Sequence, residues 1–196
     1  PNAPTGNAFP MAEVRALIEN FDGVVLVDEA YADFADDNCM NLVREYDNLI
    51  VSRTMSKSYS LAGIRFGYAV ACPELIAGMM KVKDSYNVDM LTQYIVRAAL
   101  SDQEYLAKTR SAILATRARM EQGLAKLGFK YVPSQTNFLF ATPPDNDGKR
   151  FFDVLRENAV LVRYFPGEAT GHYVRISVGS DAEIDKLLEV AARLYG

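Results

Sequence analysis

The sequence predicts an α/β fold, with a mostly parallel sheet in a large domain and a small α+β domain at the C-terminal end. The run Val24–Val27 is continuous, apolar and rich in β-branched residues, which is typical of a strand buried on both faces and usually parallel. Helical and strand-like segments then alternate through the first half, as in sheets covered by helices. After about residue 100 the pattern changes, so we expect domains at residues 1–100 and 101–196.

In the first half, apolar residues at helical spacing predict a helix that starts near Pro10 and ends before Gly23. Pro73 opens another predicted helix, and a further one runs from about Met90 to Leu100. The predicted strands are short and apolar, with a helix expected between the first two, and comprise Val24–Val27, Leu49–Val51 and Tyr68–Ala71.

In the second half, residues 101–104 (Ser-Asp-Gln-Glu) are typical of a capping box that starts a long helix, for which Gly128 is the expected C-terminal cap. Ser180 and Glu183 form a second such box before the last helix. The remaining predicted elements are three strands and two helices, namely Asn137–Phe140, Val160–Arg163, Tyr173–Val178, Lys149–Asn158 and Asp181–Leu194.

Composition excludes several classes of function. The 196 residues are 49% hydrophobic and 23% charged, which is ordinary for a globular protein. A net charge of −4 without a basic run gives no reason to expect nucleic acid as a partner, and no apolar stretch is long enough to cross a membrane. The cysteines, Cys39 and Cys72, lie far apart, so we expect a cytoplasmic protein with reduced thiols. With His172 as its single histidine, a metal site is not expected.

The chain opens on Pro-Asn-Ala-Pro-Thr-Gly at residues 1–6, without an initiator methionine. Proline and glycine at this density predict a turn, and turns connect other elements. We therefore expect the chain to be a fragment of a longer parent protein, with a partial large domain.

Residues 52–67 form the stretch around which the chain is organised. Lys57 lies among small hydroxyl residues, Arg65 follows eight positions later, and an apolar run flanks the stretch on each side. Two strands around such a loop are how α/β proteins present functional groups at strand ends. Hydroxyls and a guanidinium suit a phosphate, and the lysine could be a phosphate ligand or an amine nucleophile. A solvated loop rich in serine and lysine is the alternative interpretation.

A second stretch narrows these alternatives. Asp28 directly follows the buried strand Val24–Val27, and Tyr31 lies three residues further on. An aspartate at one strand end, with a lysine, an arginine and hydroxyls at another, suits a pyridinium ring that carries a phosphate, as in pyridoxal 5'-phosphate. Asp28 would keep the ring nitrogen protonated, Tyr31 would reach the ring oxygen and Lys57 would bind the cofactor covalently. The phosphate ligands would be Thr54, Ser56 and Arg65.

Four motifs in order resemble those of fold-type I pyridoxal-phosphate-dependent aminotransferases. They are Pro-Asn-Ala-Pro-Thr-Gly, Val-Asp-Glu-Ala-Tyr, Ser-Arg-Thr-Met-Ser-Lys-Ser-Tyr-Ser-Leu-Ala-Gly-Ile-Arg-Phe-Gly-Tyr and Val-Arg-Ile-Ser-Val-Gly. Within that superfamily the chain is most similar to the histidinol-phosphate aminotransferases, and the resemblance covers its whole length. It implies the same roles for Lys57, Asp28, Tyr31, Thr54, Ser56 and Arg65 as the chemistry does.

The resemblance also implies substrate-binding residues. Arg175 falls on the arginine that binds the substrate's α-carboxylate, and Arg163 on a position that can meet a phosphorylated tail, although either could instead be a surface charge. The family usually has asparagine directly before Pro-Thr-Gly, but here Ala3 stands there and the asparagine is Asn2. Either Asn2 contacts the ring oxygen or Tyr31 makes that contact alone.

The implied activity is transfer of an amino group from histidinol phosphate to 2-oxoglutarate, in a homodimer with small amino-acid and keto-acid substrates. The family's N-terminal half, with its glycine-rich phosphate loop, has no counterpart in this sequence. Alternatives within the fold are an aromatic aminotransferase and a threonine-phosphate decarboxylase. A different class is a fragment that is not catalytic on its own. A P-loop ATPase is disfavoured because Gly-x-x-x-x-Gly-Lys-Ser/Thr does not occur.

Overall fold

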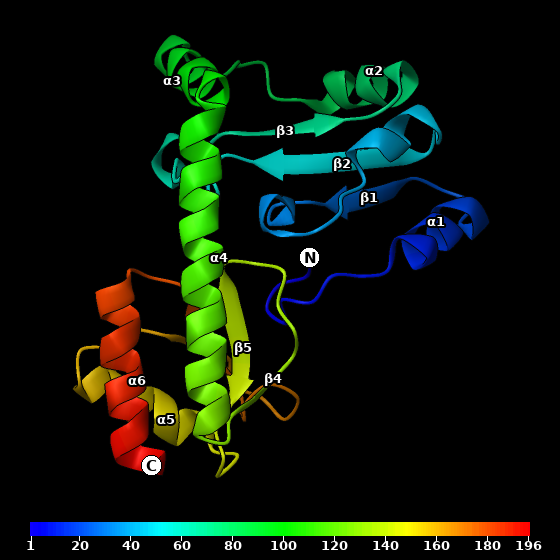
Figure 1. Cartoon of the computed structure of the whole chain (residues 1–196). Coiled ribbons are helices and arrows are strands. Elements are labelled where there is room, and N and C mark those ends of the chain that lie inside the picture. Colours follow the sequence, from blue (N-terminus) through cyan, green and yellow to red (C-terminus); the bar gives the residue numbers. More distant parts are fainter. The chain divides into compact units, whose positions relative to one another are not determined.

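The computed structural model describes all of residues 1–196, which form two compact units (Figure 1). The first unit comprises Pro1 and Phe9–Thr109, and the second comprises Asn2–Ala8 and Arg110–Gly196. The division falls inside the long helix α4 (Gln103–Lys126). The domain boundary expected at residue 100 stays a prediction, and each unit is described here by itself.

The first unit contains a three-stranded sheet in the order β1 (Val25–Asp28), β2 (Leu49–Thr54) and β3 (Gly67–Val70). β1 and β2 run parallel, with Asp28 opposite Ser52. β3 runs antiparallel to β2, so the prediction of a mostly parallel sheet is wrong for this strand. The linker between β2 and β3 contains only the short 3₁₀ helix η3 (Ala62–Ile64). A parallel return usually passes through an α-helix, and this linker contains none, which is consistent with the antiparallel pairing.

The α-helices of this unit lie where they are predicted, at α1 (Met11–Asn20), α2 (Pro73–Val82) and α3 (Met90–Ser101). The helix expected between β1 and β2 is instead a pair of 3₁₀ helices, η1 (Ala32–Phe34) and η2 (Met40–Arg44). Local side-chain bonds explain the difference, because Asp37 accepts from the Asn38 N–H and Asn38 accepts from the Met40 N–H. Such bonds favour turns over a continuous helix.

One face of β1 is buried in this unit. Val25 packs with Ile18 of α1 and with Leu49 and Val51 of β2 in one apolar cluster. Leu26, whose side chain points to the opposite face, is 59% exposed. The expectation of a strand buried on both faces is therefore wrong within this unit, because its apolar cluster covers a single face.

The second unit is built on a four-stranded antiparallel sheet in the order β4-β5-β7-β6. The strands are β4 (Lys130–Tyr131), β5 (Phe138–Thr142), β6 (Arg163–Tyr164) and β7 (Val174–Ser177). The sequence did not predict β4, and β6 is shorter than the expected Val160–Arg163 because pairing with β7 is limited to two residue pairs. Helices α5 (Gly148–Glu157) and α6 (Asp181–Tyr195) follow the prediction closely.

Helix ends in the chain are fixed by local chemistry. Ser180 and Glu183 form the predicted capping box of α6, and Gly128 takes a left-handed conformation after α4, with a φ of 82°. The box predicted at residues 101–104 is wrong. Ser101 is the last residue of α3 and donates to the Arg97 carbonyl, whereas Asp102 accepts from the Tyr105 N–H at 3.0 Å.

Packing between helices and sheet forms the core of the second unit. Met120 and Leu124 of α4 contact an apolar cluster that includes Leu139 of β5 and Ile184 of α6. At the edge of this cluster the Thr116 hydroxyl donates to Asp181 at 2.9 Å. None of the helices in the chain is long and apolar enough to cross a bilayer. No group of three or more histidine, cysteine, aspartate or glutamate side chains is placed to hold a metal ion.

Candidate active site

The ends of two parallel strands bring the predicted aspartate and lysine segments to one edge of the first sheet. The Glu29 N–H donates to the Ser52 carbonyl at 2.9 Å, which continues the β1–β2 pairing by one residue. Asp28 is exposed at this edge, and its Oδ1 accepts from the Ala30 N–H at 2.9 Å. Parallel strands end on the same side of a sheet, so the strand ends that carry Asp28 and Thr54 share this edge.

Lys57 and Tyr31 face each other at this edge. The Lys57 Nζ lies over the Tyr31 ring, 5.2 Å from its centroid, in a cation–π contact. Both side chains are partly exposed, so the ammonium is oriented without being sealed from solvent. A primary amine beside an aromatic hydroxyl at a strand edge can act as a nucleophile or carry a proton.

Hydrogen bonds close the loop that carries Lys57. The Met55 N–H donates to the Phe66 carbonyl at 3.2 Å, and the Leu61 N–H donates back to the Met55 carbonyl at 3.0 Å. Within the loop the Ser56 N–H donates to Thr54 Oγ1 at 3.1 Å. The predicted phosphate ligands Thr54 and Ser56 are thus held together directly.

Arg65 belongs to the same closed loop but directs its guanidinium differently from the prediction. Its Nη1 donates to the Ala62 carbonyl at 2.8 Å, and the side chain is exposed. No contact joins Arg65 to Thr54 or Ser56 directly, although Thr54 Oγ1 lies 3.4 Å from the carbonyl of Phe66, the next residue. Arg65 and Ser60 both take left-handed backbone conformations, with φ of 56°. Such conformations are costly for residues with a Cβ and recur at functional sites.

A buried charged network lies directly beside these residues, and sequence reasoning missed it. Arg53 donates from Nε to Glu29 Oε2 at 2.7 Å and from Nη1 to Asp33 Oδ1 at 2.9 Å. Asp33 in turn accepts from the Ser58 hydroxyl, and Glu29 accepts from the Cys39 N–H. The sequence held one indication of this network, because the oppositely charged Glu29 and Arg53 stand next to Asp28 and Thr54 beside otherwise apolar strands.

The same network affects the Cys39 thiol. Burial, followed by the nearby Glu29 carboxylate, raises the pKa of Cys39 to about 11. The thiol is therefore neutral near pH 7 and packs as a small apolar group.

The remaining predicted site residues, Asn2, Arg163 and Arg175, lie in the second unit. Asn2 is exposed and stabilises the opening turn, in which its Nδ2 donates to Thr5 Oγ1 at 2.8 Å. The Gln135 N–H donates to the Gly6 carbonyl at 2.8 Å, which attaches this turn to the segment before β5.

Two arginines face each other across neighbouring strands of the second sheet. Arg163 of β6 and Arg175 of β7 are directly paired in register. Each guanidinium carbon lies 5.5 Å from the centroid of the Phe165 ring, and that of Arg175 also lies 5.1 Å from the Phe138 ring. The Nε of Arg175 is buried and has no hydrogen-bond partner. Like charges at paired positions repel, so this arrangement is suited to an anion.

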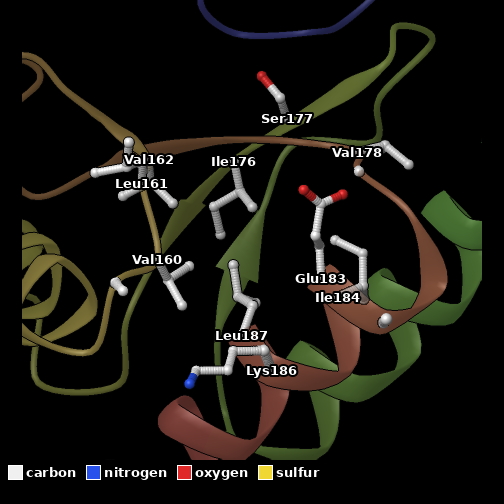
Figure 2. Close-up of a pocket in the computed structure, with 13 residues that line it drawn as sticks. Val160, Leu161, Val162, Ile176, Ser177, Val178, Glu183, Ile184, Lys186 and Leu187 are labelled. Carbon is white, nitrogen blue, oxygen red and sulfur yellow. The ribbon is translucent and has the colours of Figure 1, made fainter.

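A cavity of about 610 Å³ lies elsewhere in the second unit (Figure 2). The side chains of Val160, Ile176 and Leu187 border it, and Glu183 and Lys186 lie among its lining residues. None of the predicted site residues lines it. The cavity therefore does not enlarge the site described above.

The arrangement of lysine, aspartate and tyrosine at one strand edge agrees with a comparison to protein families. The model of aminotransferase class I and II matches residues 1–190. The chain belongs to the class I and II aminotransferases. Its matched region includes every predicted site residue, from Asn2 to Arg175.

Individual relatives of this aminotransferase chain carry a narrower name. It is 48% identical over 192 residues to the histidinol-phosphate aminotransferase of Syntrophotalea carbinolica, and 47% identical over 188 residues to that of Geobacter sulfurreducens. These matches cover 98% and 96% of this chain but 55% and 54% of the relatives. The chain thus spans about half the length of the curated relatives it matches.

A solved aminotransferase structure shows the same fold. Histidinol-phosphate aminotransferase from Sinorhizobium meliloti, crystallised in complex with pyridoxal-5'-phosphate, aligns with a TM-score of 0.87 at 30% identity. The alignment covers 99% of this chain and 56% of that structure. The predicted fold class, a partial fold-type I aminotransferase, is therefore confirmed, with the mixed sheet described above.

Proposed function

We propose that this chain forms part of a pyridoxal-phosphate-dependent aminotransferase that transfers an amino group from histidinol phosphate to 2-oxoglutarate. The products would be imidazole acetol phosphate and glutamate. Support for the reaction class comes from family membership, and support for the substrate comes from the relatives at 43–48% identity. The homodimer and the cytoplasmic location expected from the sequence belong to the same proposal.

The observation that carries the proposal is the placement of Lys57 over Tyr31, at the strand edge that also bears Asp28. The residues present fit a pyridinium ring with a phosphate group. A carboxylate, a primary amine and a phenol are available at one edge, and the hydroxyls of Thr54 and Ser56 lie in the adjoining closed loop. This donor set offers each polar part of such a cofactor a partner of suitable charge.

Each residue then has a defined task. When bound, pyridoxal phosphate supplies a ring that stabilises negative charge on the substrate's α-carbon. Lys57 Nζ would hold the cofactor and would carry a proton to and from that carbon. Asp28 would keep a proton on the ring nitrogen, and the Tyr31 hydroxyl would serve the ring oxygen. The hydroxyls of Thr54 and Ser56 orient the phosphate.

The paired arginines would bind the anionic groups of the two substrates. Arg175 offers a buried, unpartnered Nε, and a bidentate guanidinium matches a carboxylate in geometry and charge. Arg163 is exposed and directly opposite, so it is suited to a second anion such as a phosphorylated tail. Arg65 and Asn2 complete the proposed cofactor contacts, although Arg65 would first have to release the Ala62 carbonyl.

The test uses the chain itself with pyridoxal phosphate. After mixing, borohydride reduction fixes the cofactor on the lysine that holds it, and mass spectrometry maps that lysine. We expect one dominant adduct on Lys57. The exposed lysines Lys81 and Lys83 serve as internal controls for unselective labelling, and Lys57→Arg is the matched negative control.

Equal labelling of Lys57, Lys81 and Lys83 would count against the cofactor assignment. It would favour the alternative of a fragment that is not catalytic on its own. The labelling is then repeated after adding the part of a relative that this chain does not span. Selective labelling of Lys57 in that mixture would mean that the chain alone lacks part of the cofactor site, and continued equal labelling would mean that the assignment of Lys57 is wrong. In that completed enzyme, higher kcat/KM for an aromatic amino acid than for histidinol phosphate would overturn the proposed substrate.

A further inference from the structure

Asp33 joins the residues next to Asp28, Thr54 and Lys57 into a continuous chain of hydrogen bonds. Glu29 follows Asp28, Arg53 precedes Thr54 and Ser58 follows Lys57. Their bonds run from Glu29 to Arg53, from Arg53 to Asp33 and from Ser58 to Asp33. Asp33 thus contacts the loop that carries Lys57 and the strand that leads into it.

Most of these groups are shielded from water, and the side chain of Asp33, at 25% exposed, is the least shielded. Glu29 is 4% exposed and Ser58 is 5% exposed, and the side chain of Arg53 is 14% exposed. Hydrogen bonds to charged groups are stronger than neutral ones, and a low local dielectric strengthens them further. Because Arg53 bonds both carboxylates, removing it would leave Glu29 and Asp33 without their positively charged partner, whereas removing the Ser58 hydroxyl would break a single link.

We propose that the Arg53–Asp33–Ser58 chain of bonds is a positioning device that holds Lys57 against Tyr31. Arg53 anchors Asp33 to β2, and Asp33 anchors Ser58 on the loop. Because Ser58 is the residue after Lys57, its fixed position limits where the lysine side chain can reach. The use of this positioning in transamination rests on the proposed function, but the order it imposes on the loop does not.

Two properties of the chain report this order without any cofactor. The Ser60 and Leu61 N–H groups donate within the loop, to Lys57 and Met55, so their hydrogen exchange reports its opening. The acylation rate of Lys57 reports how firmly its amine is held, when compared with the rates of the exposed Lys81 and Lys83. Amides of β2 report whether the sheet itself has loosened.

The decisive variant is Ser58→Ala. We expect exchange at Ser60 and Leu61 to rise about tenfold, because a hydrogen bond to a charged group is lost. Lys57 should acylate faster and approach the rates of Lys81 and Lys83, while β2 amides exchange as in the wild type. Asp33→Asn, a second variant of the same link, should move both readouts in the same direction.

Two controls separate positioning from general stability. Ser58→Thr keeps the hydroxyl and should restore both readouts, and Ser85→Ala removes an exposed hydroxyl elsewhere in the same unit and should change neither. Wild-type exchange and acylation in Ser58→Ala would overturn the inference, as would equal acceleration of the β2 amides. Failure of the proposed function would be seen in a different experiment. The wild type would then form no cofactor adduct on Lys57, whatever the exchange and acylation of the Ser58 variants show.

Discussion

Arg163 and Arg175 occupy directly paired positions on β6 and β7, and both guanidinium groups lie 5.5 Å from the same Phe165 ring. Two cations at paired positions repel each other unless an anion or an aromatic face compensates them. Phe165 supplies part of that compensation, and the buried Nε of Arg175 still has no hydrogen-bond partner. The two arginines are therefore suited to binding an anionic ligand.

Removal of each arginine should have a distinct kinetic effect. In the enzyme completed with the missing part of a relative, we expect Arg175→Ala to raise KM for 2-oxoglutarate about a hundredfold, because a buried charge-assisted contact with its carboxylate is lost. Arg163→Ala should raise KM for histidinol phosphate and leave KM for 2-oxoglutarate unchanged. Steady-state kinetics with both substrates provide the check, and unchanged KM values in Arg175→Ala would show that the carboxylate binds elsewhere.

The Tyr31 ring should restrain Lys57 through its face rather than its hydroxyl. Tyr31→Phe keeps an aromatic face, so acylation of Lys57 should stay near the wild-type rate. Tyr31→Leu removes it, and a lost cation–π contact should raise the rate about threefold. Competitive acylation of the chain with mass-spectrometric mapping measures this. Equal rates in Phe and Leu variants would show that the 5.2 Å contact does not restrain the amine.

Stability of the second unit should depend on pH through Asp181. Hydrogen bonding from the Thr116 hydroxyl, and then from Arg119, holds the pKa of Asp181 below its ordinary value. Its ionised form is thus favoured by folding. The resulting stability is present above the unfolded-state pKa of about 3.9 and is lost as the pH falls through the lower folded-state pKa.

Asp181→Asn should therefore weaken this dependence. Melting temperatures from circular dichroism at about pH 6 and about pH 3 bracket the transition. The wild type should lose more stability between the two conditions than the variant does. Identical losses would mean that other carboxylates determine acid unfolding of this unit.

Ala159 offers a test of backbone conformation at a helix end. It follows α5 with a φ of 59°, and the next N–H, from Val160, donates to the Leu155 carbonyl at 2.8 Å. Ala159→Gly should stabilise the chain by about 1 kcal/mol, since a side chain is costly in the left-handed region. Ala118→Gly, on the exposed side of α4, is the matched control and should destabilise by about 1 kcal/mol. Denaturant unfolding measures both, and equal signs would contradict this explanation.

The sequence predicted a structural feature correctly where the interactions that determine the feature lie within a few residues of one another. The capping box of α6 and the glycine after α4 act within a few residues, so both were predicted correctly. The direction of β3 depends on pairing with β2 across a loop, and sequence periodicity does not specify it.

The site shows the same division. The segments that carry Asp28, Tyr31 and Lys57 meet at one edge of the sheet, as expected for strand ends, and the roles of these residues stay predictions. The bond between Ser58 and Asp33 joins residues 25 positions apart and exists only because two strands lie in parallel register. Arg65 was predicted as a phosphate ligand from its guanidinium chemistry and from the family motif, and its bond to the Ala62 carbonyl depends on a loop conformation that neither encodes.

The exposed face of β1 has a practical consequence for anyone who purifies this chain. β1 is the end strand of its sheet, and Leu26 is 59% exposed on it. An end strand with apolar side chains is a template for pairing with another strand. The light scattered per unit of protein should therefore increase as the concentration of this chain rises, and dilute samples will be needed for every spectroscopic experiment described above.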